Sequence, residues 1–149
     1  MLKLPKRLKF DVDVLWDGET GGTVKILNSN RVLKVEIPKE FGGKGDSFCP
    51  DELFISSIGG CLLTTLLWLA KRLNINLSDV KISVEGLMEG KLSEHEFAEI
   101  YVEMFIEAPN NEDMKAVERL VDLAKEYCRI TKALSRDIQL NFKKKIGVD

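Results

Sequence analysis

The feature that most constrains this chain is one long segment without charge. Residues 53–70 hold no charged side chain, although Asp, Glu, Lys and Arg make up 31% of the 149 residues. Pro50 suits the first turn of a helix, and Asp51 and Glu52 suit the positive end of its dipole. The pattern predicts a helix over residues 50–73, roughly 35 Å long. Such a helix must be buried either in protein or in lipid, because it is apolar on nearly every side.

Alternating apolar and polar residues predict strands on both sides of this helix. The first of them is expected to be half-buried through Phe10, Val12, Val14 and Trp16. Short turns between the first three strands indicate an antiparallel meander. The strands are predicted over residues 9–16, 23–27, 32–37, 81–87, 97–108 and 138–142, and a second helix is predicted to begin after a cap at residues 109–111 and to end near Cys128.

The predicted element order is therefore β-β-β-α-β-β-α-β, which is typical of the α+β class. We expect a single domain over residues 1–149, with antiparallel sheets around a long central apolar helix. The uncharged segment is long enough to span a membrane. However, a spanning helix would leave half of the strands on each side of the bilayer, so we expect a core helix and no membrane contact. One sheet covers only part of such a helix, and the sequence therefore predicts a homodimer in which a second subunit covers the rest.

Composition excludes several other classes of function. The net charge of −2 and the pI near 5.6 give no overall attraction to nucleic acid. The N-terminus lacks the apolar core of a signal peptide, which predicts a cytoplasmic protein. Three cysteines have the wrong parity for a disulfide scaffold. One histidine, His95 in a polar turn, and no paired-cysteine motif indicate that no metal site is present.

The cysteines leave two interpretations open. Cys61 follows Gly59 and Gly60, two residues that cost a helix roughly 1 kcal/mol each and indicate close packing beside the cysteine. A buried free cysteine is most often a packing residue. Alternatively, a thiolate that attacks a peroxide becomes a sulfenic acid, and a nearby thiol such as Cys128 condenses with it to a disulfide. Cys49 is a rival nucleophile, because it stands just before a helix start, where a thiolate is stabilised.

Several of these residues together resemble a known family. Pro50-Asp51-Glu52-Leu53-Phe54, Gly59-Gly60-Cys61 and the late Tyr127-Cys128-Arg129-Ile130 are similar to the motifs of the OsmC/Ohr family of organic hydroperoxide reductases. The family pattern is Pro-Glu-x-Leu before a small-residue pair and a cysteine, followed by a late Cys-Pro motif. Arg129 stands here in place of that proline. The resemblance covers essentially the whole chain and the predicted element order.

The resemblance implies an OsmC-like fold, an intertwined homodimer and specific roles for site residues. Cys61 matches the peroxide-reducing cysteine and Cys128 the resolving cysteine, while Asp51, with Glu52 adjacent, takes the place of the carboxylate that orients an arginine. That arginine corresponds to Thr23 in one branch of the family and, in the other, to Lys39 or, with a shift of one residue, to Glu40. The implied substrates are a small organic hydroperoxide and an external dithiol reductant of the lipoyl type, with no bound cofactor.

The missing arginine keeps a second function open. In that interpretation the chain is a non-catalytic member of the same family, a dimer that binds a small apolar ligand. The sequence therefore yields two hypotheses, a thiol-dependent peroxidase and an apolar-ligand binder.

Overall fold

In the computed structural model, which describes residues 7–149, the secondary structure follows the predicted order with two short additions. The elements are β1 (Val12–Trp16), β2 (Gly21–Ile26), β3 (Val32–Glu36), η1 (Lys39–Phe41), α1 (Pro50–Leu73), β4 (Asp79–Glu89), β5 (Glu96–Ala108), α2 (Met114–Tyr127), α3 (Arg129–Ala133) and β6 (Gln139–Val148). The 3-10 turn η1 and the short helix α3 were not predicted. The described chain divides into two compact units, one ending at Leu53 and the other running from Phe54 to Asp149.

The N-terminal unit is the predicted antiparallel meander, with β2 between β1 and β3. The Asp17 carboxylate shapes the first turn by accepting from the N–H groups of Glu19 (2.8 Å) and Gly21 (3.3 Å). The prediction of a half-buried first strand was wrong. All five residues of β1 are exposed, and Trp16 exposes 77% of its surface, because nothing in the described chain covers the apolar side chains of this strand.

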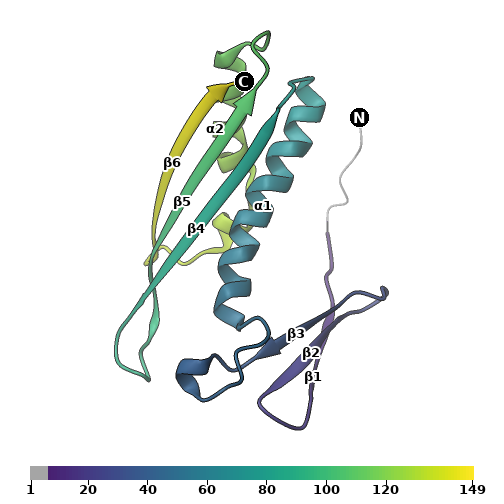
Figure 1. The fold of residues 1–149 in the computed structure, drawn as a ribbon, viewed down its shortest axis with the longest axis vertical. Coiled ribbons are helices and arrows are strands. Elements are labelled where there is room, and N and C mark those ends of the chain that lie inside the picture. Colours follow the sequence, from purple (N-terminus) through teal and green to yellow (C-terminus); the bar gives the residue numbers. More distant parts are fainter. Residues whose placement is uncertain (1–6) are drawn as a thin grey trace. The chain divides into compact units, whose positions relative to one another are not determined.

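The C-terminal unit is built on a second sheet with the order β4-β5-β6 (Figure 1). β4 pairs with β5 in the antiparallel sense, but β6 pairs with β5 in the parallel sense, from Glu99↔Gln139 to Ala108↔Val148. The expectation of purely antiparallel sheets was therefore wrong. A parallel neighbour requires a long crossover connection, and α2 with α3 supplies it.

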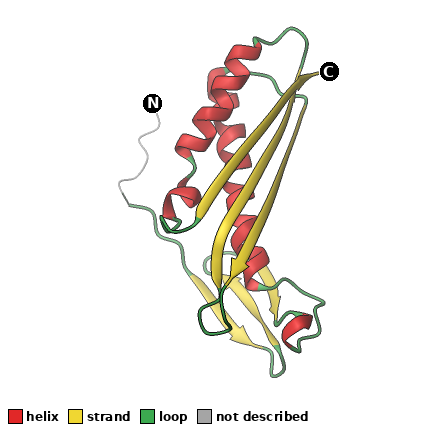
Figure 2. Ribbon diagram, turned by 90° about the vertical axis from the view of Figure 1, so that its left-hand side faces the viewer, coloured by secondary structure: helices red, strands yellow, loops and turns green. Residues whose placement is uncertain are grey.

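Both long helices lie on one face of this sheet (Figure 2). Their apolar side chains and the inward residues of β5 form the core, which consists of Ile58, Leu62, Leu66, Leu69, Ala70, Ile100, Val102, Met104, Ile106, Ala108, Val117, Leu120, Val121, Ala124 and Cys128. The N-cap of α2 is Asp113, whose side chain accepts from the Lys115 N–H at 3.0 Å. The cap predicted at residues 109–111 was thus placed too early.

Helix α1 has the predicted bounds. Its first backbone hydrogen bond joins the Leu53 N–H to the Cys49 carbonyl at 3.2 Å, and the Glu52 carboxylate accepts from the Cys49 N–H at 3.0 Å. The bond from the Cys49 N–H to the Glu52 carboxylate is one of the two bonds of a capping box. Among the described residues, α1 is the one helix long and apolar enough to cross a membrane, and 28% of its most apolar window is buried within the chain. Much of its apolar surface is therefore uncovered by the single chain.

Candidate active site

The C-terminal unit brings two of the three cysteines together. Cys61 lies in the middle of α1 and is half-buried, whereas Cys128 is completely buried at the junction between α2 and α3. Both are free thiols, and their side chains are close enough for each to shift the pKa of the other. The second helix ends directly before Cys128, as its predicted end near this residue required.

The Cys61 sulfur is surrounded by hydrogen-bond donors. Burial by itself would raise the pKa of the Cys61 thiol, but this effect is outweighed by the Ile130 N–H, the Cys128 thiol, the Arg129 N–H and the Thr65 hydroxyl. The pKa of Cys61 is consequently lower than that of an ordinary thiol. Cys61 therefore loses its proton more readily than an ordinary thiol, and the thiolate is the reactive form of cysteine.

Cys128 has the opposite environment. Burial raises its pKa, and the neighbouring Cys61 raises it further, although hydrogen bonds from Thr131 act against this. The Thr131 hydroxyl also donates to the Cys128 carbonyl at 3.2 Å. Two adjacent thiols with pKa values displaced in opposite directions can divide their roles, with Cys61 as the attacking thiolate and Cys128 as a protonated partner.

Two neighbouring threonines on α1 use their hydroxyls differently. The Thr64 hydroxyl donates to the carbonyls of Gly60 (2.9 Å) and Cys61 (3.3 Å), as is common for threonine within a helix. The Thr65 oxygen instead lies 4.0 Å from the Cys61 sulfur. Among the described residues, Thr65 carries the one hydroxyl that lies within hydrogen-bonding distance of the Cys61 sulfur.

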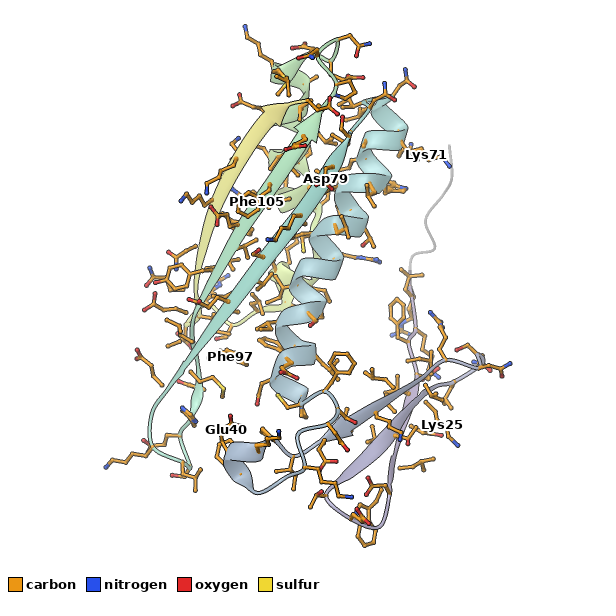
Figure 3. All side chains as sticks on the ribbon, in the orientation of Figure 1. Lys25, Glu40, Lys71, Asp79, Phe97 and Phe105 are labelled. Atoms are coloured by element: carbon orange, nitrogen blue, oxygen red, sulfur yellow. The ribbon has the colours of Figure 1, made fainter. Side chains whose placement is uncertain are left out.

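The other predicted site residues belong to the N-terminal unit. Lys39 and Glu52 line a hollow of about 200 Å³ together with Cys49, the loop residues Gly45 and Ser47, and Pro38 and Glu40. Figure 3 labels Glu40, the middle residue of the short 3-10 helix η1. Asp51 is exposed in the first turn of α1. The roles predicted for Lys39, Asp51 and Glu52 at the cysteine pair remain predictions.

The two glycines before Cys61 were predicted to allow close packing beside the cysteine, but Gly59 instead faces strand β4. A Cβ on Gly59 would lie 3.2 Å from Val84 Cγ2, so Gly59 permits close packing of α1 against β4. Gly59 is two residues from Cys61 and therefore about 200° away around the helix. A hollow of about 350 Å³ lies on that side, lined by Ile55, Ser56, Gly59, Gly60, Leu63, Ile82 and Val84.

The part of the site that sequence reasoning missed is the backbone after Cys128. Arg129 and Ile130 supply N–H groups to Cys61 because Cys128 has an extended conformation between two helices (φ −65°, ψ 112°). The departure from the Cys-Pro motif was the available signal, because proline has no N–H to donate. Within residues 7–149, no cluster of three or more His, Cys, Asp or Glu residues is arranged to hold a metal ion.

Comparison with known proteins identifies the family of the chain. Residues 43–143 match the family model described as OsmC-like protein. YmaD, an uncharacterized protein of Bacillus subtilis, is 22% identical over 128 residues, which cover 84% of this chain and 85% of YmaD.

Solved structures share the fold at low identity. An OsmC-like protein from Mycoplasma pneumoniae has a TM-score of 0.78 and 17% identity, with 93% of this chain and 97% of that chain covered. An organic hydroperoxide resistance protein OsmC from Legionella pneumophila has a TM-score of 0.69 and 20% identity, with 95% and 97% covered.

Proposed function

Because the chain belongs to the OsmC-like protein family, we propose that it is a thiol-dependent peroxidase that reduces organic hydroperoxides. The observation that supports this most directly is the Cys61 sulfur, whose pKa is lowered beside the buried thiol of Cys128. A peroxidase of this kind needs one thiolate to attack the peroxide and a second thiol to resolve the product. The pair provides both within one unit of the chain.

The reaction proceeds in three balanced steps. The Cys61 thiolate attacks the outer oxygen of the hydroperoxide, the O–O bond breaks, and the organic alkoxide leaves and takes up a proton as an alcohol. The Cys128 thiol then condenses with the Cys61 sulfenic acid, forming a disulfide and releasing water. An external dithiol, such as a lipoyl-type reductant, finally reduces the disulfide by exchange and is itself oxidised to a disulfide.

The N-terminal unit supplies the remaining proposed groups. Lys39 polarises the peroxide oxygen, and the carboxylates of Asp51 and Glu52 orient the Lys39 ammonium group. The Lys39 stem lies against Gly45, since a Cβ on Gly45 would be 2.5 Å from Lys39 Cγ. Lysine is a point charge and cannot clamp a peroxide in the bidentate manner of arginine. The proposed location of the reaction is the cytoplasm.

Mass spectrometry after one equivalent of cumene hydroperoxide tests the function. We expect the loss of two hydrogens from the chain and a peptide that joins Cys61 to Cys128. Cys61→Ser should abolish peroxide consumption, whereas Cys128→Ser should leave a sulfenic acid on Cys61 that a dimedone probe traps. Cys49→Ser is the matched control and should retain both consumption and the disulfide. Consumption of cumene hydroperoxide at the parent rate by Cys61→Ser would refute the proposal.

A second candidate function is favoured by the hollow beside Gly59. Ile55, Leu63, Ile82 and Val84 give it an apolar lining suited to a small apolar ligand. In this alternative the chain is a non-catalytic binder, and the cysteines have no redox role. An unchanged thiol count after hydroperoxide treatment, together with saturable binding of an apolar fluorescent probe, would favour the binder.

We also propose that the protein is a homodimer whose second subunit covers the exposed side of α1. Ser56, Gly60 and Thr64 follow one another at four-residue intervals on that side, and nothing lies within 4 Å of a Cβ built on Gly60. Small side chains allow another helix to approach closely. Leu67 and Trp68 continue the surface and are 47% and 46% exposed. The charged end of the helix follows at Lys71 (Figure 3).

Sedimentation equilibrium tests this assembly. We expect a dimer at micromolar concentration, partial dissociation in Gly60→Ala and a monomer in Gly60→Leu, because side-chain volume grows in that order. A stable monomer of the parent protein would refute the dimer. Flotation of the parent protein with phospholipid vesicles would instead indicate that lipid covers this face.

A further inference from the structure

The neighbours of the Cys61 sulfur in the C-terminal unit are neutral. They are the Thr65 hydroxyl at 4.0 Å, the N–H groups of Arg129 and Ile130, and the Cys128 thiol. Within the C-terminal unit, no cationic side chain is among the groups that act on this sulfur. An anion can nevertheless be stabilised without a cation where several N–H and O–H donors converge on it.

The geometry holds these donors in place through separate elements. Thr65 is on α1 itself, one helical turn after Cys61, so its distance from the sulfur is set by the helix. The N–H groups of Arg129 and Ile130 come from the first turn of α3. That turn is fixed by the Thr131 hydroxyl, which donates to the Cys128 carbonyl at 3.2 Å.

Thr64 and Thr65 differ in their hydrogen-bond partners, and the Thr65 hydroxyl does not donate to a backbone carbonyl of the helix as the Thr64 hydroxyl does. Thr64 donates to two backbone carbonyls of α1. Thr65 could make the same kind of bond to the carbonyl of Cys61, which lies four residues earlier. Among the described residues, its partner is instead the Cys61 sulfur, 4.0 Å away. The Thr65 hydroxyl is half-buried with that sulfur rather than turned to solvent.

We propose that the Cys61 thiolate is held by neutral donors, namely the Thr65 hydroxyl and the N–H groups of Arg129 and Ile130, in place of a cationic side chain. Arg129 acts here through its backbone and not through its guanidinium. The catalytic role of this thiolate rests on the proposed peroxidase function. Its stabilisation by the donors does not, because it can be measured in the reduced protein without peroxide. In this scheme Lys39 polarises the peroxide oxygen and does not stabilise the Cys61 thiolate.

The test measures how fast iodoacetamide alkylates Cys61 at neutral pH, with each cysteine followed separately by peptide mass spectrometry. A hydrogen bond to a charged group is worth enough to change a population about tenfold. We therefore expect Thr65→Val to slow alkylation of Cys61 about tenfold and Thr65→Ser to restore it. Thr64→Val is the matched control and should leave the rate unchanged.

Arg129 allows the backbone donor to be separated from the side chain. Arg129→Pro removes the N–H, and the first position of a helix accepts proline without loss of structure. Arg129→Ala removes the guanidinium and keeps the N–H. We expect Arg129→Pro to slow alkylation about tenfold and Arg129→Ala to have little effect. Circular dichroism of each variant checks that the fold is retained.

Three outcomes would overturn the proposal. Equal slowing by Arg129→Ala and Arg129→Pro would assign the effect to the guanidinium. Slowing by Lys39→Gln to the extent seen in Thr65→Val would assign it to a cation of the N-terminal unit. Unchanged rates in both Thr65→Val and Arg129→Pro would show that neither donor holds the thiolate. A protein that shows the expected alkylation pattern but consumes no hydroperoxide would refute the peroxidase and leave this inference standing.

Discussion

Gly59 of α1 faces Val84 of β4 so closely that a Cβ on Gly59 would lie 3.2 Å from Val84 Cγ2. A larger side chain at this position must push α1 and β4 apart. We expect Gly59→Leu to lower the free energy of unfolding by roughly 1–3 kcal/mol, the usual cost of overpacking a core. Urea denaturation at one fixed protein concentration measures this, because dimerisation would make the apparent stability depend on concentration.

The cause can be checked by making room on β4. Val84→Ala in the Gly59→Leu background should recover part of the loss, so that the two substitutions are not additive. An equal loss with and without Val84→Ala would show that Gly59 is needed for a reason other than contact with Val84.

The two cysteines should respond to pH in opposite directions. The pKa of Cys61 is lower than that of an ordinary thiol, because the donors around it outweigh its burial, and the pKa of Cys128 is raised by burial. Alkylation of Cys61 should therefore begin at a lower pH than that of a free cysteine peptide, and alkylation of Cys128 at a higher pH. Rates measured from pH 5 to pH 10 by peptide mass spectrometry would contradict the assignment if Cys128 reacted first.

The same displacement has a consequence for stability. Since the pKa of Cys61 is lower in the folded than in the unfolded chain, its contribution is complete above the unfolded value and is lost as the pH falls through the folded value. The difference in unfolding free energy between the parent protein and Cys61→Ala should thus grow as the pH rises between these two values. A difference that shrinks with rising pH would contradict the lowered pKa.

The sequence predicted most of the fold because its strongest patterns are local. The uncharged segment fixed α1 at Pro50–Leu73, and the alternation in β5 fixed the longest strand almost to the residue. The pairing of β6 was not predictable in the same way. The direction of this strand depends on the end of the sheet to which the crossover through α2 and α3 returns the chain. No local pattern in Gln139–Val148 encodes that end.

The candidate site was predictable for its side chains and not for its backbone. The resemblance of the motifs around Cys61 and Cys128 implied that the two cysteines act as a pair, and the structure brings their side chains close together; their roles in a reaction remain predictions. The donors of Arg129 and Ile130 depend on the conformation of Cys128 between two helices, which the sequence did not reveal because α3 spans only five residues. The exposure of β1 was missed for a related reason: alternation shows which side chains share a face and not whether anything covers that face.

The run Lys143-Lys144-Lys145 lies in β6, and its members have distinct partners. Lys143 and Lys145 lie 3.5 Å and 2.9 Å from Glu103 Oε1 on the neighbouring strand, while Lys144 points to the other face and lies 3.1 Å from Asp122 Oδ1 of α2. The alternation of a strand accounts for this division. It also provides two adjacent lysines with different surroundings.

Lys145 should control the titration of Glu103. The pKa of Glu103 is lowered chiefly by its hydrogen bond with Lys145. We therefore expect Lys145→Gln to move the midpoint of the Glu103 titration to higher pH, as followed by carbon NMR of the side-chain carboxyl group. Lys144→Gln is the matched control, since Lys144 contacts Asp122 instead, and it should leave the midpoint in place. Because a lowered carboxyl pKa stabilises the fold above the unfolded value and loses this effect as the pH falls, Lys145→Gln should reduce stability at neutral pH more than in acid. Equal shifts in the two variants would mean that Glu103 senses only the overall charge of the strand.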